Sequence, residues 1–154
     1  MKKLGPVSGM GNVQDRPKKT GSWISPVRIL VVEDFAPFRQ FIGSALARRS
    51  DLQIVGDATD GKEAVQKAEE LQPDLILLDI GLPTLNGIEA AQRIRQVAPE
   101  SKIIFVSQES SADVVQKALN SGAQGYVVKT KAATDLLAAA EAVLNGKQSL
   151  SSGL

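Results

Sequence analysis

The sequence predicts an α/β fold: a doubly wound parallel sheet of five strands, in the order 2-1-3-4-5, with helices on both faces. Two observations support this prediction. Apolar runs at residues 29–32 and 75–78 consist of β-branched and aliphatic side chains, which is typical of strands buried on both faces. Segments with helical spacing alternate with such runs along the chain. This alternation implies right-handed crossovers and a parallel sheet.

The first strand and helix are expected at about residues 28–32 and 36–49. The apolar residues of this helix follow the spacing i, i+3, i+4, i+7 and i+8: Phe38, Phe41, Ile42, Ala45 and Leu46. Such spacing gives the helix one apolar face, which we expect to pack on the sheet.

The next three units are separated by turn and breaker residues. Their strands are expected at about 53–58, 75–79 and 102–107, and their helices at about 61–71, 86–98 and 111–121. Pro73 and Pro99 follow two of these helices and precede strands, and proline stops a helix from continuing.

Residues 56–63 resemble a phosphate-binding P-loop, but the match fails at its last position. Glu63 replaces the Ser or Thr whose hydroxyl would bind magnesium, and Asp57 and Asp60 would repel a polyphosphate. We therefore interpret this segment as a strand-to-helix turn, with Asp60 or Gly61 near the helix cap.

The last strand and helix are expected at about 125–129 and 131–145. The helix again carries one apolar face, formed by Ala133, Leu136, Leu137, Ala140 and Leu144. Gly122 and Gly146 stand where C-terminal helix caps are expected.

The 154 residues fit a single domain with tails. Residues 1–25 are rich in Gly, Pro, Lys and Ser and hold five basic residues against one acidic residue, so we expect a disordered basic extension. We expect the domain at residues 26–148, where the net charge is mildly negative, and the start of a linker or a C-terminal tail at 149–154.

Composition excludes several kinds of function. The chain has no Cys and no His, which rules out a thiol nucleophile, a Ser-His-Asp mechanism and a His-ligated metal within it. No apolar run approaches the roughly 20 residues that cross a bilayer, and Lys2 and Lys3 are not followed by the apolar segment of a secretory signal. We expect a soluble cytoplasmic protein without a membrane partner.

Charged side chains end three of the predicted strands. Glu33 and Asp34 follow the first strand, Asp79 ends the third, and Lys129 ends the fifth. The carboxyl ends of parallel strands meet at one edge of the sheet, where ligands bind in such folds. The carboxylates would repel one another there, and a bound Mg²⁺, which prefers oxygen ligands, would relieve the repulsion. Lys129 and the Ser107 hydroxyl could then bind a phosphoryl group.

These motifs, in this order and spacing, resemble response-regulator receiver domains, the CheY-like family with a flavodoxin-like fold. The matching residues are Glu33-Asp34, the stretch from Asp79 to Gly87, Ser107, and Tyr126 to Lys129. The resemblance covers about residues 27–147. The stretch at 118–129 is similar in particular to receivers of NarL/FixJ-type transcriptional regulators, which carry a DNA-binding domain beyond the receiver.

The resemblance implies a role for each of these residues. Asp79 would accept a phosphoryl group from a histidine kinase, and Lys129 would pair with that group. Asp34, Asp79 and the Gly81 carbonyl would bind Mg²⁺ directly, and Glu33 would act through water. Ser107 and Tyr126 would form the switch that remodels the face made by the fourth helix, the fifth strand and the fifth helix.

Two positions depart from the family pattern. Thr130 follows Lys129 where many receivers have proline, and Gln108 follows Ser107 where a small residue is commoner. Because receivers often have a cis bond after this lysine, the resemblance also predicts a cis peptide bond between Lys129 and Thr130.

The expected function is a phosphorylation-controlled switch, the regulatory part of a transcriptional regulator, and not an enzyme with a separate substrate. The expected partners are a sensor histidine kinase or phosphotransfer protein and, on activation, a second copy of the chain. Without a helix-turn-helix pattern, no specific DNA binding is expected from these residues alone. A stand-alone receiver and an interaction module that is never phosphorylated remain alternatives. A haloacid-dehalogenase-type phosphatase fits less well, because its second Asp would stand where Gly81 is.

Overall fold

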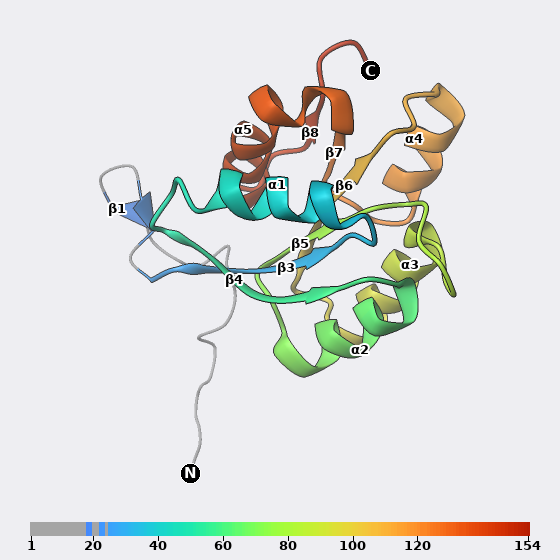
Figure 1. Ribbon diagram of the computed structural model, residues 1–154, viewed down its shortest axis with the longest axis horizontal. Helices are drawn as coiled ribbons and strands as arrows, with labels where there is room; N and C mark the ends of the chain where they lie inside the picture. The colour runs from blue at the N-terminus through green and yellow to red at the C-terminus, as the bar shows by residue number, and fades with distance from the viewer. Residues whose placement is uncertain (1–17, 20–21, 24) are drawn as a thin grey trace.

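The computed structural model describes residues 18–19, 22–23 and 25–154 (Figure 1). The strands are β1 (Lys18–Lys19), β2 (Ser22–Trp23), β3 (Val27–Val32), β4 (Leu52–Ala58), β5 (Leu75–Leu78), β6 (Lys102–Ser107), β7 (Gly125–Val128) and β8 (Ser149–Leu150). The helices are α1 (Ala36–Leu46), α2 (Gly61–Leu71), α3 (Gly87–Val97), α4 (Ala112–Asn120) and α5 (Ala132–Leu144), with a 3-10 turn at Lys129–Lys131.

The main sheet is parallel, and its strand order is β4-β3-β5-β6-β7-β8. Its first five strands have the predicted order 2-1-3-4-5, so the predicted fold class is confirmed. Helices α1 and α5 cover one face, and α2, α3 and α4 cover the other (Figure 1). Strand β3 serves both cores: Ile29 and Val31 face α1 and α5, and Leu30 and Val32 face the opposite layer.

The register of the sheet aligns the carboxyl ends of its central strands. Val32 of β3 is paired with Leu78 of β5, and Ser107 of β6 with Val128 of β7. The residues that follow these strands therefore emerge at one edge, on the right-hand side of Figure 1. This edge is the one on which the charged residues were expected to meet.

The five main strands and four of the helices lie within one residue of their predicted bounds. Helix α1 differs, because it ends at Leu46 instead of 49. The chain turns there so that Arg49 can pair with Asp51 at 2.6 Å and with Glu141 of α5 at 3.2 Å. The apolar spacing used to predict the helix contains no information about these ion pairs, so it could not predict the earlier end of α1.

The predicted helix caps at Asp60, Gly122 and Gly146 are confirmed. Asp60 caps α2 by accepting a hydrogen bond from the Glu63 backbone N–H at 2.7 Å, and Glu63 accepts one from the Thr59 N–H at 2.9 Å. These bonds satisfy backbone donors at the start of α2, much as a capping box does, and they support the interpretation of 56–63 as a turn. Gly122 and Gly146 have φ of 102° and 85°, the region that favours glycine after a helix.

The structure differs from the expected organisation at both ends of the chain. The segment 149–154 was expected to leave the domain, but Ser149–Leu150 pairs with Gly125–Tyr126 as a sixth parallel strand. In the basic extension, β1 and β2 form a short antiparallel pair, and the rest of 1–25, apart from Ser25, lies outside the described residues. None of the helices among the described residues has the length and apolar character needed to cross a membrane.

Candidate functional site

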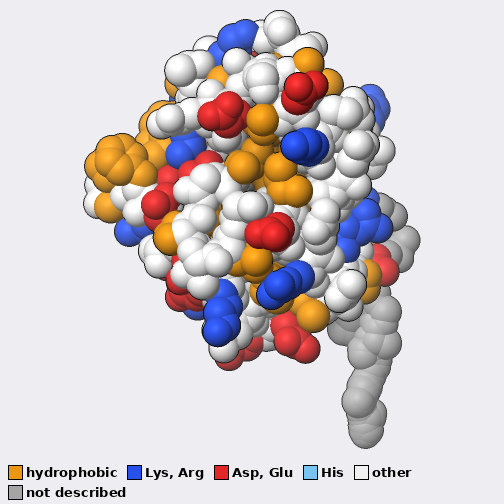
Figure 2. Space-filling model, turned by 90° about the vertical axis from the view of Figure 1, so that its right-hand side faces the viewer, with side chains coloured by type: hydrophobic (Ala, Val, Ile, Leu, Met, Phe, Trp, Pro, Cys, Tyr) orange, Lys and Arg blue, Asp and Glu red, His pale blue; other side chains and the backbone are white. Residues whose placement is uncertain are grey.

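Three carboxylates meet at the carboxyl edge of the sheet. Glu33 and Asp79 are only 1% and 7% exposed, whereas Asp34 is exposed. One oxygen of each lies within 4.8 Å of the others. They line a hollow of about 400 Å³ together with Gly81, Ser107 and Lys129. Figure 2 looks onto this side of the molecule, where acidic and basic side chains lie between exposed hydrophobic ones.

Lys129 is the cation of the site. Its Nζ lies 2.9 Å from Glu33 Oε1 and 3.1 Å from Asp79 Oδ2. Burial opposes the charged form of Lys129, but the two carboxylates outweigh this effect and raise the pKa of Lys129. The pKa of Glu33 is raised by burial and by the nearby Asp79, against the opposing influence of Lys129. The site therefore holds more negative charge than one lysine neutralises.

The backbone around Asp79 is fixed by the start of α3. The Ile80 N–H donates to Asp79 Oδ1 at 2.8 Å, and the Gly87 N–H donates to the Ile80 carbonyl at 2.7 Å. A Cβ on Gly87 would lie 2.0 Å from the Asp79 carbonyl oxygen, so only glycine permits this approach. Sequence reasoning included Gly87 in the motif without a role. Its position at a helix start, eight residues after an acidic strand end, gave no sign of that contact.

Helix α1 supports the site with two side chains that sequence reasoning did not assign to it. Arg39 Nη1 donates to the Glu33 carbonyl at 2.8 Å. Lys129 Nζ lies 4.8 Å from the centre of the Phe38 ring, a cation–π distance. The helical spacing identified Phe38 only as part of an apolar face, because its contact with Lys129 joins residues that are far apart in the sequence.

The two predicted switch residues lie together on β6 and β7. Ser107 is 2% exposed, and its Oγ accepts a hydrogen bond from the Glu109 N–H at 3.2 Å. Tyr126 is fully buried, and its hydroxyl donates to the Glu109 carbonyl at 2.7 Å. Burial raises the pKa of Tyr126, and a contact with the Ser107 hydroxyl partly offsets this. Tyr126 therefore lies inside the domain and contacts the loop after β6 through the Glu109 carbonyl.

The prediction of a cis bond between Lys129 and Thr130 is wrong, because no peptide bond among the described residues is cis. The 3-10 turn at Lys129–Lys131 carries Lys129 to both carboxylates with a trans backbone. A cis bond before a residue other than proline costs about 2.5–4 kcal/mol, and the turn makes that cost unnecessary.

The donor set fits Mg²⁺. The three carboxylates offer hard oxygen ligands within reach of one ion. The exposed Asp34 leaves room for the waters that magnesium retains. Gly81 is also exposed at the hollow and adds no side chain to it, whereas Gln108 and Glu109 contribute to its lining.

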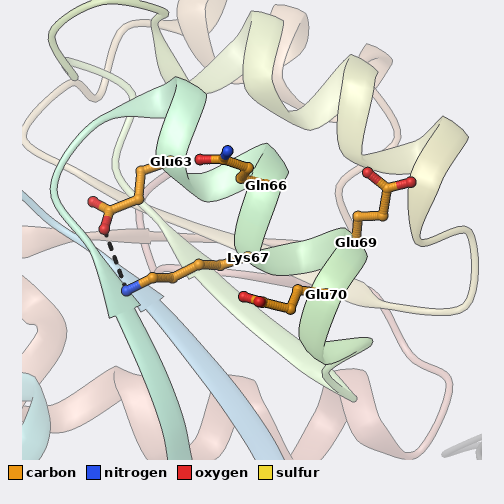
Figure 3. A pocket seen from close by; sticks show the side chains of 5 residues that line it. All are labelled: Glu63, Gln66, Lys67, Glu69 and Glu70. Atoms are coloured by element: carbon orange, nitrogen blue, oxygen red, sulfur yellow. Dashed lines mark ion pairs between the residues drawn. The ribbon is translucent and has the colours of Figure 1, made fainter.

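A second hollow lies over α2 and is not part of this site (Figure 3). It is lined by Glu63, Gln66, Lys67, Glu69 and Glu70, all from one helix. Lys67 pairs with Glu63 at 3.2 Å, one helical turn away. These side chains are those of a solvated helix face, and Lys67 also donates to the Asp57 carbonyl of β4.

Comparison with known proteins agrees with this geometry. The family model for the response regulator receiver domain matches residues 29–141. The response regulator protein VraR of Staphylococcus saprophyticus is 34% identical over 122 residues, which are 79% of this chain and 58% of VraR. The chain thus spans a little over half the length of this curated relative.

Two solved structures are similar in fold and sequence. A LuxR-family two-component response regulator from an Aurantimonas species has a TM-score of 0.79 and 33% identity, covering 83% of this chain and 91% of its own. The receiver domain of the putative response regulator NarL from Mycobacterium tuberculosis has a TM-score of 0.76 and 28% identity, covering 80% and 99%. The chain is therefore a member of the response regulator receiver domain family.

Proposed function

We propose that Asp79 is the residue that accepts the phosphoryl group, in a magnesium-dependent reaction carried out by the domain's own residues. The observation that carries this proposal is the position of Asp79: a nearly buried carboxylate at the end of the central strand, 3.1 Å from Lys129 Nζ. Its Oδ1 already accepts a backbone hydrogen bond. One acceptor oxygen is therefore oriented, and the cation for the incoming phosphoryl oxygens is already present.

The reaction is a displacement at phosphorus. A carboxylate oxygen of Asp79 forms a bond to the phosphorus as the bond from phosphorus to the donor's nitrogen breaks, and the electron pair remains with that nitrogen. Lys129 moves its contact from Asp79 to a phosphoryl oxygen, and the Ser107 hydroxyl donates to another. Hydrolysis of the acyl phosphate by water, which could approach past Gly81, returns Asp79 to its starting form.

Asp34, Asp79 and the Gly81 carbonyl hold the magnesium ion in this proposal, and Glu33 acts through a bound water. The bound ion supplies positive charge that offsets the repulsion between the carboxylates and the phosphoryl oxygens. The support is the cluster of three carboxylates, two of which, Glu33 and Asp79, share the single ammonium of Lys129. The exposure of Asp34 favours weak binding with several waters retained.

The switch uses Ser107, Tyr126 and the loop at residues 108–111, which contains Glu109. A phosphoryl group on Asp79 draws the Ser107 hydroxyl toward it, which changes the Ser107–Glu109 hydrogen bond. Because Tyr126 donates to the Glu109 carbonyl, the same movement reaches the side chain that β7 presents to α4. The face formed by α4, β7 and α5, together with β8 along the edge of β7, is therefore the output surface in this proposal, and it is the surface that a second copy of the chain would contact.

The donor is a sensor histidine kinase or a phosphotransfer protein, which sets the cytoplasm as the expected compartment. The relatives named as LuxR-family and VraR response regulators support a role as the regulatory part of a transcriptional regulator. The isolated chain should give no sequence-specific gel shift. Binding through its basic extension should disappear with added salt.

Incubation with acetyl phosphate and Mg²⁺, followed by intact-mass measurement, tests the acceptor. Wild-type protein should gain one phosphoryl mass, and Asp79→Asn should gain none. Asp57→Asn is the matched control, because Asp57 is an exposed aspartate on β4, outside the site. Labelling of Asp79→Asn at the wild-type level would show that another residue is the acceptor, and a wild-type protein without label would favour the unphosphorylated interaction module.

A further inference from the structure

Strand β8 occupies the edge of β7, which no other described strand covers. The Ser149 N–H donates to the Gln124 carbonyl at 3.1 Å, and the Ser151 N–H donates to the Tyr126 carbonyl at 2.9 Å. Gly125 leaves room for this pairing, since a Cβ there would lie 3.2 Å from the Ser149 carbonyl oxygen. The segment is therefore docked on the strand that carries Tyr126 and leads into Lys129.

Ser151 continues this docking where the strand pairing ends. Its side chain is buried, and its Oγ accepts a hydrogen bond from the Val128 N–H at 3.0 Å. Val128 is buried as well and immediately precedes Lys129. A buried N–H without a partner costs about 1–3 kcal/mol, so the Ser151 hydroxyl takes the place of the strand carbonyl that β8 does not supply here.

Ser152 contacts the far end of the 3-10 turn at Lys129–Lys131. Lys131 Nζ donates to the Ser152 carbonyl, and Lys131 closes the 3-10 turn that starts at Lys129. The segment therefore contacts the turn at both ends: Ser151 binds the backbone N–H of Val128, and the Ser152 carbonyl binds the side chain of Lys131. Between these points the chain carries the lysine that pairs with Glu33 and Asp79.

The backbone position of the turn matters because a lysine side chain is long and flexible, so placing its ammonium on a phosphoryl oxygen has an ordering cost. Holding the turn in place in advance lowers that cost. The hydroxyl of Ser151 touches none of the reacting groups, so it can act only through Val128 and the turn.

We propose that residues 149–152 form a clamp on the turn that carries Lys129, with Ser151 as its positioning residue, so that docking of this segment and phosphoryl binding at Asp79 favour each other. This inference rests on the proposed function of Asp79. Coupling between two binding events is reciprocal. A phosphoryl group held by Lys129 should therefore tighten the clamp, and loosening the clamp should slow phosphorylation.

The first test compares phosphorylation rates of the full chain with acetyl phosphate at saturating Mg²⁺. Ser151→Ala should react about fivefold more slowly, the effect expected from one lost hydrogen bond. The Mg²⁺ concentration at half-effect should stay unchanged, because Lys129 does not bind the metal. Ser151→Thr, which keeps the hydroxyl, should retain most of the wild-type rate. Ser149→Ala is the matched control, since the described hydrogen bonds of Ser149 use its backbone.

The second test uses hydrogen exchange in the wild-type chain, so it does not depend on the folding of a variant. Adding beryllofluoride with Mg²⁺, a phosphoryl analogue, should slow exchange of the amides at 149–152 compared with Mg²⁺ alone. Unchanged exchange there would overturn the clamp. So would a wild-type rate in Ser151→Ala together with faster exchange at Val128, because the clamp would then be open without consequence. Failure of the proposed function looks different: wild-type protein would take up no phosphoryl group at all.

Discussion

Replacing Lys129 with methionine removes the positive charge of the site while keeping the length of the side chain. In the wild-type protein the Lys129 ammonium lies 2.9 Å from Glu33 and 3.1 Å from Asp79. Methionine can keep the stem packed near Phe38, over whose ring the ammonium lies. The substitution therefore isolates the electrostatic role of the lysine.

The size of the effect follows from the geometry of the carboxylates. Oxygens of Glu33 and Asp79 lie within 4.8 Å of each other, and at an effective dielectric constant of about 20 two unit charges at that distance repel by about 3 kcal/mol. Losing one partner of a buried ion pair typically costs about 3–5 kcal/mol. We expect Lys129→Met to lower the free energy of unfolding by about 3 kcal/mol at pH 8 in EDTA, which lowers the melting temperature by about 10 °C.

Two conditions should reverse most of this loss. The pKa of Glu33 is raised by burial, so the folded state binds a proton more readily than the unfolded state. Stability gained in this way is present at low pH and is lost as pH rises through the folded pKa. Without Lys129 the pKa of Glu33 in the folded state should rise further. The stability of the variant should therefore approach that of wild type as pH falls from 8 toward 5.5. Mg²⁺ should also stabilise the variant more than wild type, because the metal replaces the missing charge.

The measurement is thermal unfolding at pH 8 and pH 5.5, with EDTA and with Mg²⁺. Lys62→Met is the control, because Lys62 is an exposed lysine in the first turn of α2, and surface substitutions usually change stability by less than about 0.5 kcal/mol. If Lys129→Met has the same melting temperature as Lys62→Met and wild type in EDTA at pH 8, the carboxylates do not repel one another as argued, and the reasoning fails.

Three further predictions address separate parts of the site. Asp34→Asn should abolish the rise in melting temperature that Mg²⁺ gives wild type; a rise of equal size in the variant would remove Asp34 from the metal site. Tyr126→Phe should lose about 1 kcal/mol of unfolding free energy in a denaturant titration, because its bond to the Glu109 carbonyl disappears; unchanged stability would mean that this bond contributes nothing. Gly87→Ala should destabilise the domain by about 1–3 kcal/mol and slow phosphorylation, because its Cβ would force the backbone of Asp79 to move; a wild-type rate would show that Asp79 tolerates the shift.

The sequence by itself determined the fold class and the positions of the charged residues of the site. Alternating strands and helices are local patterns, and they set the parallel order that the structure has. Because parallel strands end at a common edge, Glu33, Asp34, Asp79 and Lys129 could be assigned to one place from their positions after apolar runs alone. The same local reasoning located Asp60 as a helix cap.

Tertiary structure decided how that site is held together. Arg39 on Glu33, Gly87 against Asp79, and Ser151 on Val128 join residues from different elements. Residues 149–150 carry no apolar run that predicts a strand, and they form one because β7 offers an open edge beside them. The turn that carries Lys129 also depends on such contacts, because Ser151 binds the Val128 backbone and Lys131 binds the Ser152 carbonyl. Local patterns report what a segment prefers, whereas these contacts depend on which surfaces the folded chain brings within hydrogen-bonding distance.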